Sequence, residues 1–324
     1  MTNYKDIHGS NIETVTSDPS NPINGQVWYN STSQALKGFT SNPAGSWSTQ
    51  PALNTGRFQG GGSGTQTSAL AFGGEYSGSP SQSVLCETWN GSGWTEVGDL
   101  NKGRNKLPGC GASATSALAF GGDANNDPSV ADTETWNGSS WTEVGDLNTG
   151  RGRTTGTGIA TAAIICGGGS GVQLTETWNG SSWTEVGDLN EAKEYLPISG
   201  TYTSAITGGG LHPPSTVLTT CESWNGSAWT EVADMNTSGG GRSSFGEDNT
   251  VALSHEGSAT ESWNGSAWSE VTDRNTNVGS GMNGDSPAGA GFAFGGSSPS
   301  PPQFSGASEF FTSPVINTVT FTVS

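Results

Sequence analysis

Carboxylate side chains recur in a fixed pattern along this sequence. In TETWNGSSWTEVGDLN, at residues 133–148, they are Glu134, Glu143 and Asp146, and the same letters return at 175–190. Two carboxylates close together could act as the acid and base of glycoside hydrolysis. Because comparable copies occur five times, they do not mark a single active site. We expect them to hydrogen-bond neighbouring loop amides or to pair with the arginine that follows DLN, with a weak ring of Ca²⁺ sites as the alternative.

Each copy also places two tryptophans around an Asn-Gly-Ser tripeptide. Such pairs could form a platform that stacks on sugar rings. A pair in every unit favours packing between units instead, since a buried Trp covers about 150–250 Å². The pairs are Trp89 and Trp94, Trp136 and Trp141, Trp178 and Trp183, Trp224 and Trp229, and Trp263 and Trp268.

The Asn-Gly-Ser tripeptides have two readings, a glycosylation acceptor and a tight turn. They begin at Asn90, Asn137, Asn179, Asn225 and Asn264. The first residues, MTNYKDIHGS, contain no apolar signal segment, so contact with a secretory glycosylation system is not expected. Asn and Gly tolerate the positive φ that a two-residue hairpin needs. We therefore expect a hairpin turn at each tripeptide.

The cysteines and histidines do not form a recognisable reactive group. Cys86, Cys110, Cys166 and Cys221 include no CxxC pair, so no metal site is expected and small buried side chains in strands are. A disulfide is left open. No Ser-His-Asp or Cys-His grouping is evident. We expect no catalytic residues and no enzymatic activity.

Composition limits the classes of partner. The chain has 324 residues and a net charge of -18, which disfavours nucleic acid and anionic membranes. No stretch approaches the roughly 20 apolar residues of a membrane span, so membrane insertion is not expected. Hydrophobic residues make up only 31%, yet the regular placement of 12 tryptophans indicates a folded chain.

The repeat itself predicts the architecture. A Trp that follows the turn recurs at 47, 94, 141, 183, 229 and 268. An apolar run ending in Gly-Gly recurs between these positions, as VALSHEG in its degenerate form at 251–257, and once more at 293–296, after the last Trp, so the two markers are offset along the chain. Each unit has four short strand signals, which is typical of a β-propeller blade. We predict an all-β, six-bladed propeller, or seven blades if 26–39 adds its own strands. Residues near 45–54 and 281–311 should share the sixth blade and close the ring.

The unit resembles a kelch repeat, over about residues 45–311. The residues that carry the resemblance are Gly121, Gly122, Trp136, Trp141 and Arg151. Other units match the last position with Arg57, Arg104 and Arg242, and one has Lys193 there. The unit after Trp268 lacks this basic residue, so an unbroken ring of arginine contacts is not expected.

The repeated residues WNGSxWTEV and DLN, with the Ala-Phe-Gly-Gly copies, also resemble those of kelch-like proteins of marine bacteriophages. In addition, SDPSNPINGQVWYNSTSQALKGF, at 17–39, resembles a short module of phage tail and fibre proteins. The resemblance implies a tail- or fibre-associated virion protein, made in the host cytoplasm and released by lysis. Residues 1–44 would attach it to other virion proteins, the propeller would bind a host-surface glycan or receptor, and the chain would form a homo-oligomer. A capsid or tail decoration protein is the alternative, and a glycan-acting enzyme or secreted adhesin a minor one.

Loops that differ between units are the expected ligand surface, because variable loops on a rigid scaffold usually carry binding. They follow the Gly-Gly doublets and should lie on the face opposite the Asn-Gly-Ser turns. We expect His212 to touch a partner there, and His255, which replaces part of a Gly-Gly marker, to pack locally. The expected binding residues are Tyr76, Asn125, Asn126, Asp127, Gln173, His212, Gln303 and Phe304.

The C-terminal segment 312–324 reads as one more strand. Its end, VINTVTFTVS, alternates apolar and polar residues with period two and has no charge. Left unpaired, it would be an aggregation-prone edge strand. We expect it to pair with the N-terminal region or to lie in a subunit interface.

Overall fold

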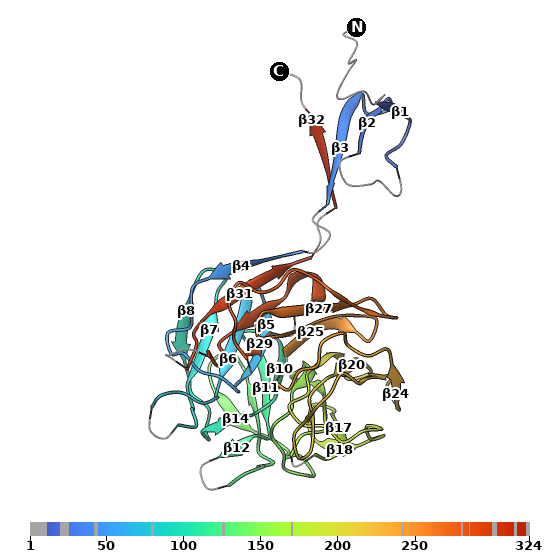
Figure 1. Ribbon diagram of the computed structural model, residues 1–324. Helices are drawn as coiled ribbons and strands as arrows, with labels where there is room; N and C mark the ends of the chain where they lie inside the picture. Colours follow the sequence, from blue (N-terminus) through green and yellow to red (C-terminus); the bar gives the residue numbers. More distant parts are fainter. Residues whose placement is uncertain are drawn as a thin grey trace. The chain divides into compact units, whose positions relative to one another are not determined.

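The computed structural model shows an all-β protein, as expected, with one short 3-10 helix, η1 (Ala288–Ala290), among the described residues (Figure 1). These are residues 12–19, 26–41, 45–78, 81–124, 127–169, 171–241, 243–279, 281–284, 286–299, 303–313 and 316–321. The chain forms two compact units: a smaller one, Met1–Ser46 with Ser313–Ser324, and a larger one, Trp47–Thr312. The C-terminal segment thus belongs with the N-terminal one.

The smaller unit is one sheet of order β1-β2-β3-β32. Its strands are β1 (Glu13–Val15), β2 (Val27–Asn30), β3 (Ala35–Ser41) and β32 (Ile316–Phe321). The last two pair antiparallel from Leu36 opposite Phe321 to Ser41 opposite Ile316, which confirms that the C-terminal strand pairs with the N-terminal region. Residues 26–39 therefore supply strands to this separate unit.

A carboxylate organises the described part of this smaller unit. Lys37 Nζ lies 2.6 Å from Asp18 Oδ2, and Asn30 and the buried Trp28 both donate to Asp18 Oδ1. These bonds favour the charged form and lower the pKa of Asp18 to about 2, with Lys37 as the largest cause.

In the larger unit, the described residues form six four-stranded sheets. Five consist of consecutive strands: β5–β8 (Gly61–Thr65, Ser68–Phe72, Cys86–Trp89, Trp94–Val97), β10, β11, β13, β14 (Gly109–Ser113, Ser116–Phe120, Thr133–Trp136, Trp141–Glu143), β15–β18 (Gly156–Ile159, Ala162–Cys166, Thr175–Trp178, Trp183–Glu185), β19, β20, β23, β24 (Ile198–Thr201, Ser204–Gly208, Cys221–Trp224, Trp229–Val232) and β25–β28 (Ser243–Asp248, Val251–Glu256, Ala259–Trp263, Trp268–Glu270). Two small ladders join β9 (Arg104–Asn105) to β12 (Asp123–Ala124), and β21 (Leu211–His212) to β22 (Thr216–Val217).

The sixth sheet is shared between two distant segments. Its order is β29 (Met282–Asn283), β30 (Phe292–Phe294), β31 (Ser308–Thr312) and then β4 (Ser46–Gln50). The expected partnership of these segments is confirmed. The first strands of successive sheets contact one another in the order β5, β10, β15, β19, β25 and β29, and β29 contacts β5. This arrangement is propeller-like.

The repeated residues explain why each unit forms such a sheet. In β11 the run Ala117–Phe120 is buried on both faces, as suits a strand between neighbouring sheets. At the turn after β13, Asn137 Oδ1 accepts bonds from the amides of Ser139 and Ser140, and Gly138 has a φ of 93°. The equivalent bonds occur in all five tripeptides, so the expected hairpin turn is confirmed.

The tryptophan pairs are packing elements, as expected. The rings of Trp136 and Trp141 lie 5.4 Å apart, both are buried, and Trp136 Nε1 donates to the Ala114 carbonyl. Each second Trp also reaches the neighbouring sheet: Trp141 contacts the ring of Phe72 at 5.0 Å. The pairs therefore fill the space between sheets.

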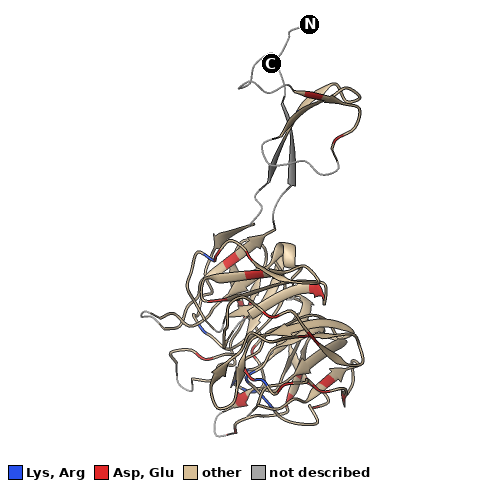
Figure 2. Ribbon diagram, turned by 45° about the vertical axis from the view of Figure 1, so that its right-hand side comes forward, with Lys and Arg blue, Asp and Glu red and all other residues tan. Residues whose placement is uncertain are grey.

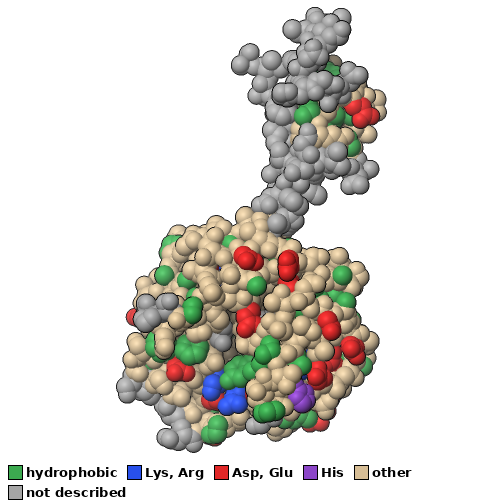
Figure 3. All heavy atoms as spheres, viewed as in Figure 1, with side chains coloured by type: hydrophobic (Ala, Val, Ile, Leu, Met, Phe, Trp, Pro, Cys, Tyr) green, Lys and Arg blue, Asp and Glu red, His purple; other side chains and the backbone are tan. Residues whose placement is uncertain are grey.

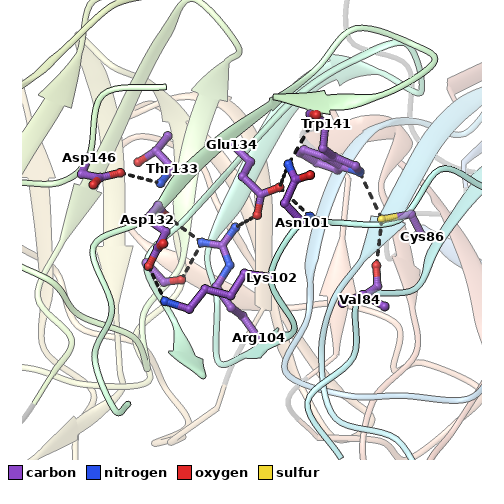
Figure 4. A network of polar contacts seen from close by, with 11 residues as sticks. Val84, Cys86, Asn101, Lys102, Arg104, Asp132, Thr133, Glu134, Trp141 and Asp146 are labelled. Carbon is purple, nitrogen blue, oxygen red and sulfur yellow. Dashed lines mark hydrogen bonds and ion pairs between the residues drawn. The ribbon is translucent and has the colours of Figure 1, made fainter. Parts of the chain in front are cut away.

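A buried carboxylate network ties each sheet to the next (Figure 4). Glu134 in β13 is 1% exposed and accepts bonds from the backbone N and Nδ2 of Asn101, both at 2.8 Å. Arg104 Nη2 lies 2.7 Å from its other oxygen. Asn101 and Arg104 belong to the segment that leaves the preceding sheet. The expectation that these carboxylates bond loop amides and the arginine after DLN is confirmed for Glu134.

This inter-sheet network recurs at every junction. The other buried glutamates are Glu87 (with Asn54 and Arg57), Glu176 (Asn148, Arg151), Glu222 (Asn190, Lys193), Glu261 (Asn236) and Glu309 (Asn275, Arg274). Arg242 lies outside the described residues. Glu143 and Asp146, the other recurring acids, are exposed, and Asp146 accepts a bond from the Thr133 amide.

One sequence expectation about this network is wrong. The unit after Trp268 does have a basic partner: Arg274 Nη2 lies 3.4 Å from Glu309 Oε1. Arg274 stands where three other units have the leucine of DLN. It therefore precedes the Asn, whereas the repeat pattern places the basic residue after it. Its side chain is buried against Trp47, with 5.4 Å from the guanidinium carbon to the ring.

His255 lies within the degenerate Gly-Gly marker, as expected. It faces Thr260 across the ladder, as Phe120 faces Thr133, so it takes the place of the marker's phenylalanine. The local packing is confirmed, since the His255 ring lies 5.7 Å from that of Trp47. Arg274 Nη1 is 3.4 Å from His255 Nδ1. One sheet junction has thus exchanged a Phe and a Leu for a His and an Arg together.

We predict that Glu134→Gln destabilises the protein, because it leaves the buried Arg104 guanidinium without a counter-charge. The expected loss in the free energy of unfolding is about 3 kcal/mol, as for other broken buried ion pairs. Urea unfolding followed by tryptophan fluorescence measures it. Glu143→Gln is the matched control, because Glu143 lies directly opposite Glu134 in the ladder but is exposed, and its effect should stay within about 0.5 kcal/mol. Equal effects of the two variants would contradict the role given to the network.

We also predict that the cysteines resist thiol reagents in the folded protein. All four are thiols buried in strands, as expected, and burial raises the pKa of Cys86 to about 12 and of Cys221 to about 11. The thiolate is the reactive form, so a disulfide-exchange reagent at mildly alkaline pH should label none of them until denaturant is added. Rapid labelling of the native protein would show that these strands open readily.

Candidate functional site

The loops expected to bind a ligand do lie with the segments that leave each sheet. Gly74 N donates to the Arg104 carbonyl, Arg104 N to Ser83, and Leu100 N to Val84. The loop after a Gly-Gly doublet and the following GDLN segment therefore share one face, as the strand order requires.

The predicted binding residues are spread over these outer loops. Asp127, Gln173, His212 and Gln303 are exposed, Tyr76 and Phe304 are half-buried, and Asn125 and Asn126 lie outside the described residues. Phe304 packs its ring against Phe58 at 5.7 Å. The described ones do not line the cavity described next, and their role stays a prediction.

A cavity opens where the first strands of the six sheets converge, and we call it the inner cavity. Its empty volume, which includes the open solvent at its mouth, is about 670 Å³. The lining residues come just before or at the start of those strands: Gln59–Gly62, Lys106–Gly109, Arg153–Gly156, Tyr195, Gly241, Ser244 and Gly281–Asn283.

Four lining residues adopt a backbone conformation that favours glycine. Gln59, Lys106, Arg153 and Tyr195 have φ between 50° and 58°. An L-residue in this region costs roughly 1–2 kcal/mol, so it persists where the surroundings hold it. Backbone bonds between sheets do so here: Arg153 N donates to the Lys106 carbonyl, Tyr195 N to Arg153, and Gly241 N to Tyr195. The rim of the inner cavity is therefore a linked row of fixed residues.

The charged residues of the lining are both cations. Lys106 Nζ lies 2.9 Å from Asp123 Oδ2, and Arg153 Nη1 lies 3.3 Å from Glu194 Oε2. The side chains of Lys106 and Arg153 stay 22% and 38% exposed, whereas both acids are nearly covered and neither lines the cavity. Figure 3 shows basic side chains gathered in one small group on the face in view, beside hydrophobic ones.

An aromatic ring lies beside one of the two cations that line the inner cavity. The Arg153 guanidinium carbon lies 6.0 Å from the centre of the Tyr195 ring. Partial burial acts to lower the pKa of Arg153, but Tyr195 and Glu194 outweigh it and the pKa is raised, so the side chain stays charged. The inner cavity can therefore offer fixed positive charge, neutral polar groups and one aromatic ring to a ligand.

The described residues contain neither a metal-binding cluster nor a membrane-spanning helix. In the described ranges, no three His, Cys, Asp or Glu side chains gather where they could hold a metal ion. The same part of the chain contains no helix long and apolar enough to cross a bilayer. The recurring buried glutamates, considered above for calcium or catalysis, bond asparagine, backbone amides and basic side chains.

Comparison with known proteins gives no match, either to a family model or to a curated protein. The functional argument therefore rests on the chain's own residues. The inner cavity was not predicted from the sequence, although a signal exists: the residue two places after the Arg or Lys of each inter-sheet network varies, in RFQ, RNK, RGR and KEY. Its variation beside a constant neighbour marks it as a specialised position.

We predict opposite outcomes for two substitutions at Gln59, whose φ is 56°. Gln59→Val puts a β-branched residue in the left-handed region and should lower the free energy of unfolding, whereas Gln59→Gly relieves that conformation. The two variants should differ by roughly 1–2 kcal/mol in urea unfolding. Equal stabilities would mean that the rim is not held in this conformation in solution.

Proposed function

We propose that the larger unit is a closed, six-bladed β-propeller of the kelch type. The cyclic contacts of the six first strands and the sheet shared by β4 and β29–β31 support this. So does the recurrence of the Glu–Asn contact at six junctions. A ring leaves no exposed sheet edge between first and last blades, which suits a chain that must stay soluble.

We further propose that the chain is a phage virion protein whose propeller binds a host-surface glycan or receptor. The observation that carries the binding role is the inner cavity, where five similar repeats contribute different residues at equivalent places: Gln59, Lys106, Arg153, Tyr195 and Ser244. Repeats that served only as scaffold would have no physical reason to differ at one rim. The smaller unit would attach the chain to other virion proteins.

A decoration protein of the capsid or tail is the second candidate. The outer hairpins favour it, because they are nearly identical and carry exposed acids such as Glu143 and Asp146 at equivalent places. Figure 2 shows acidic positions distributed over the sheets of the larger unit. A catalytic role is less favoured, because the recurring glutamates that could act as acid and base are bound in the inter-sheet network.

Immunogold electron microscopy of phage particles, with antibodies raised against the purified chain, tests this proposal. We predict label on the tail tip or fibres. Label on the capsid would favour the decoration role instead. No label on any particle would contradict the virion assignment and leave the minor alternative of an adhesin, and an unrelated antibody is the control.

A further inference from the structure

We propose that the inner cavity binds the carboxylate-bearing sugar residue of an acidic glycan, with Arg153 and Lys106 facing the carboxylate. This inference rests on the proposed binding function and names its ligand class.

The charge pattern points to an anion. The protein has a net charge of -18, yet two cations and no carboxylate line the cavity. Most other described bases of the larger unit are buried against glutamates: Arg57, Arg104, Arg151, Lys193 and Arg274. The outer strands instead carry exposed acids, Glu96, Glu143, Glu185, Glu231 and Glu270. An anion is therefore repelled from the flanks and attracted at the cavity.

The two cations are held in place before any ligand arrives. Asp123 holds the Lys106 side chain and Glu194 holds that of Arg153 through ion pairs. The hydrogen bond from Arg153 N to the Lys106 carbonyl fixes the spacing of the two residues' backbones. A guanidinium has five N–H donors in a planar fork that matches a carboxylate. Little side-chain freedom remains to be lost on binding, which favours affinity.

The neutral lining favours a sugar over a bare inorganic anion. Gln59 and Asn283 supply amide groups, whereas the Thr155 hydroxyl is already bonded to the backbone of Leu196 and Ile198. Half-buried Tyr195 supplies a ring face on which a sugar can lie.

Titration calorimetry of the full chain with glucuronate, glucose, cyclohexanecarboxylate and sulfate separates these contributions. We expect glucuronate to bind best, because it alone has both the carboxylate and the ring hydroxyls. Glucose equal to glucuronate would overturn the role of the cations. Sulfate or cyclohexanecarboxylate equal to glucuronate would overturn the sugar assignment. No binding of glucuronate at millimolar concentration would overturn the inference as a whole.

Arg153→Gln and Lys106→Gln test the site itself. Glutamine is already present at the equivalent left-handed position as Gln59, so the rim should keep its backbone. Each variant should weaken glucuronate binding at least about tenfold, as expected for a lost charge-assisted bond. Lys102→Gln is the matched control, since Lys102 is a partly exposed base, bonded to Asp132, that does not line the cavity. Equal loss in all three variants would indicate general charge attraction and contradict the site.

The outcomes distinguish this inference from the proposed function. If immunogold labels the fibres but glucuronate does not bind the chain, the acidic-sugar site is wrong and the virion role stands. If glucuronate binds through Arg153 but no particle is labelled, the site stands and the virion role is wrong. Urea midpoints of the variants show whether each remains folded, so that a loss of binding reports on the site.

Discussion

The larger unit depends on one contact, a buried glutamate that accepts hydrogen bonds from the segment leaving the preceding sheet. Apolar faces alone would let neighbouring sheets slide, because hydrophobic attraction has no direction. A buried carboxylate has strict requirements, since its desolvation is unfavourable unless its oxygens are bonded. Asn101 supplies two donors to Glu134 and Arg104 supplies the opposite charge. The contact therefore fixes the angle and register of one sheet on the next.

The same contact determines where the inner cavity forms. Once Asn101 and Arg104 are bound to the next sheet, the chain has four residues, Asn105 to Pro108, in which to turn back toward the start of β10. Lys106 makes this turn in the left-handed region, and Arg153 does so at the following junction. The scaffold thus brings the side chain that stands two places after the Arg or Lys of each inter-sheet network to the rim of the inner cavity. Variation there alters the lining without disturbing the glutamate contact.

Much of the fold could be predicted from the sequence because its signals are local and repeated. The Asn-Gly turns, the tryptophan pairs and the alternation of the last strand are each contained within a few residues, and the offset between the first Trp marker and the first Gly-Gly marker indicated the shared sheet. The exchange of Phe and Leu for His255 and Arg274 was not predictable in this way. Those two positions are 19 residues apart, and only their packing against Trp47 explains why they change together.

The candidate site was harder to predict for a related reason. The inner cavity takes single residues from segments as distant as Gln59 and Asn283, and each is inconspicuous alone. Reasoning about loop variability pointed to the longer outer loops, where Tyr76, Gln173 and His212 lie apart from the cavity. What distinguishes the rim is the conjunction of strained backbone and cations held by ion pairs.

Charge then limits how a ligand can approach this rim. The acids exposed on the outer strands, such as Glu143 and Glu185, repel a long polyanion that lies along the flanks, whereas Lys106 and Arg153 attract one acidic residue. Screening confines both effects to roughly 8 Å at physiological ionic strength. A terminal or protruding acidic sugar satisfies both conditions, because only its tip must enter the cavity. If the cavity binds an acidic sugar as proposed, we therefore expect the acidic repeats to favour the end of a glycan chain over its middle.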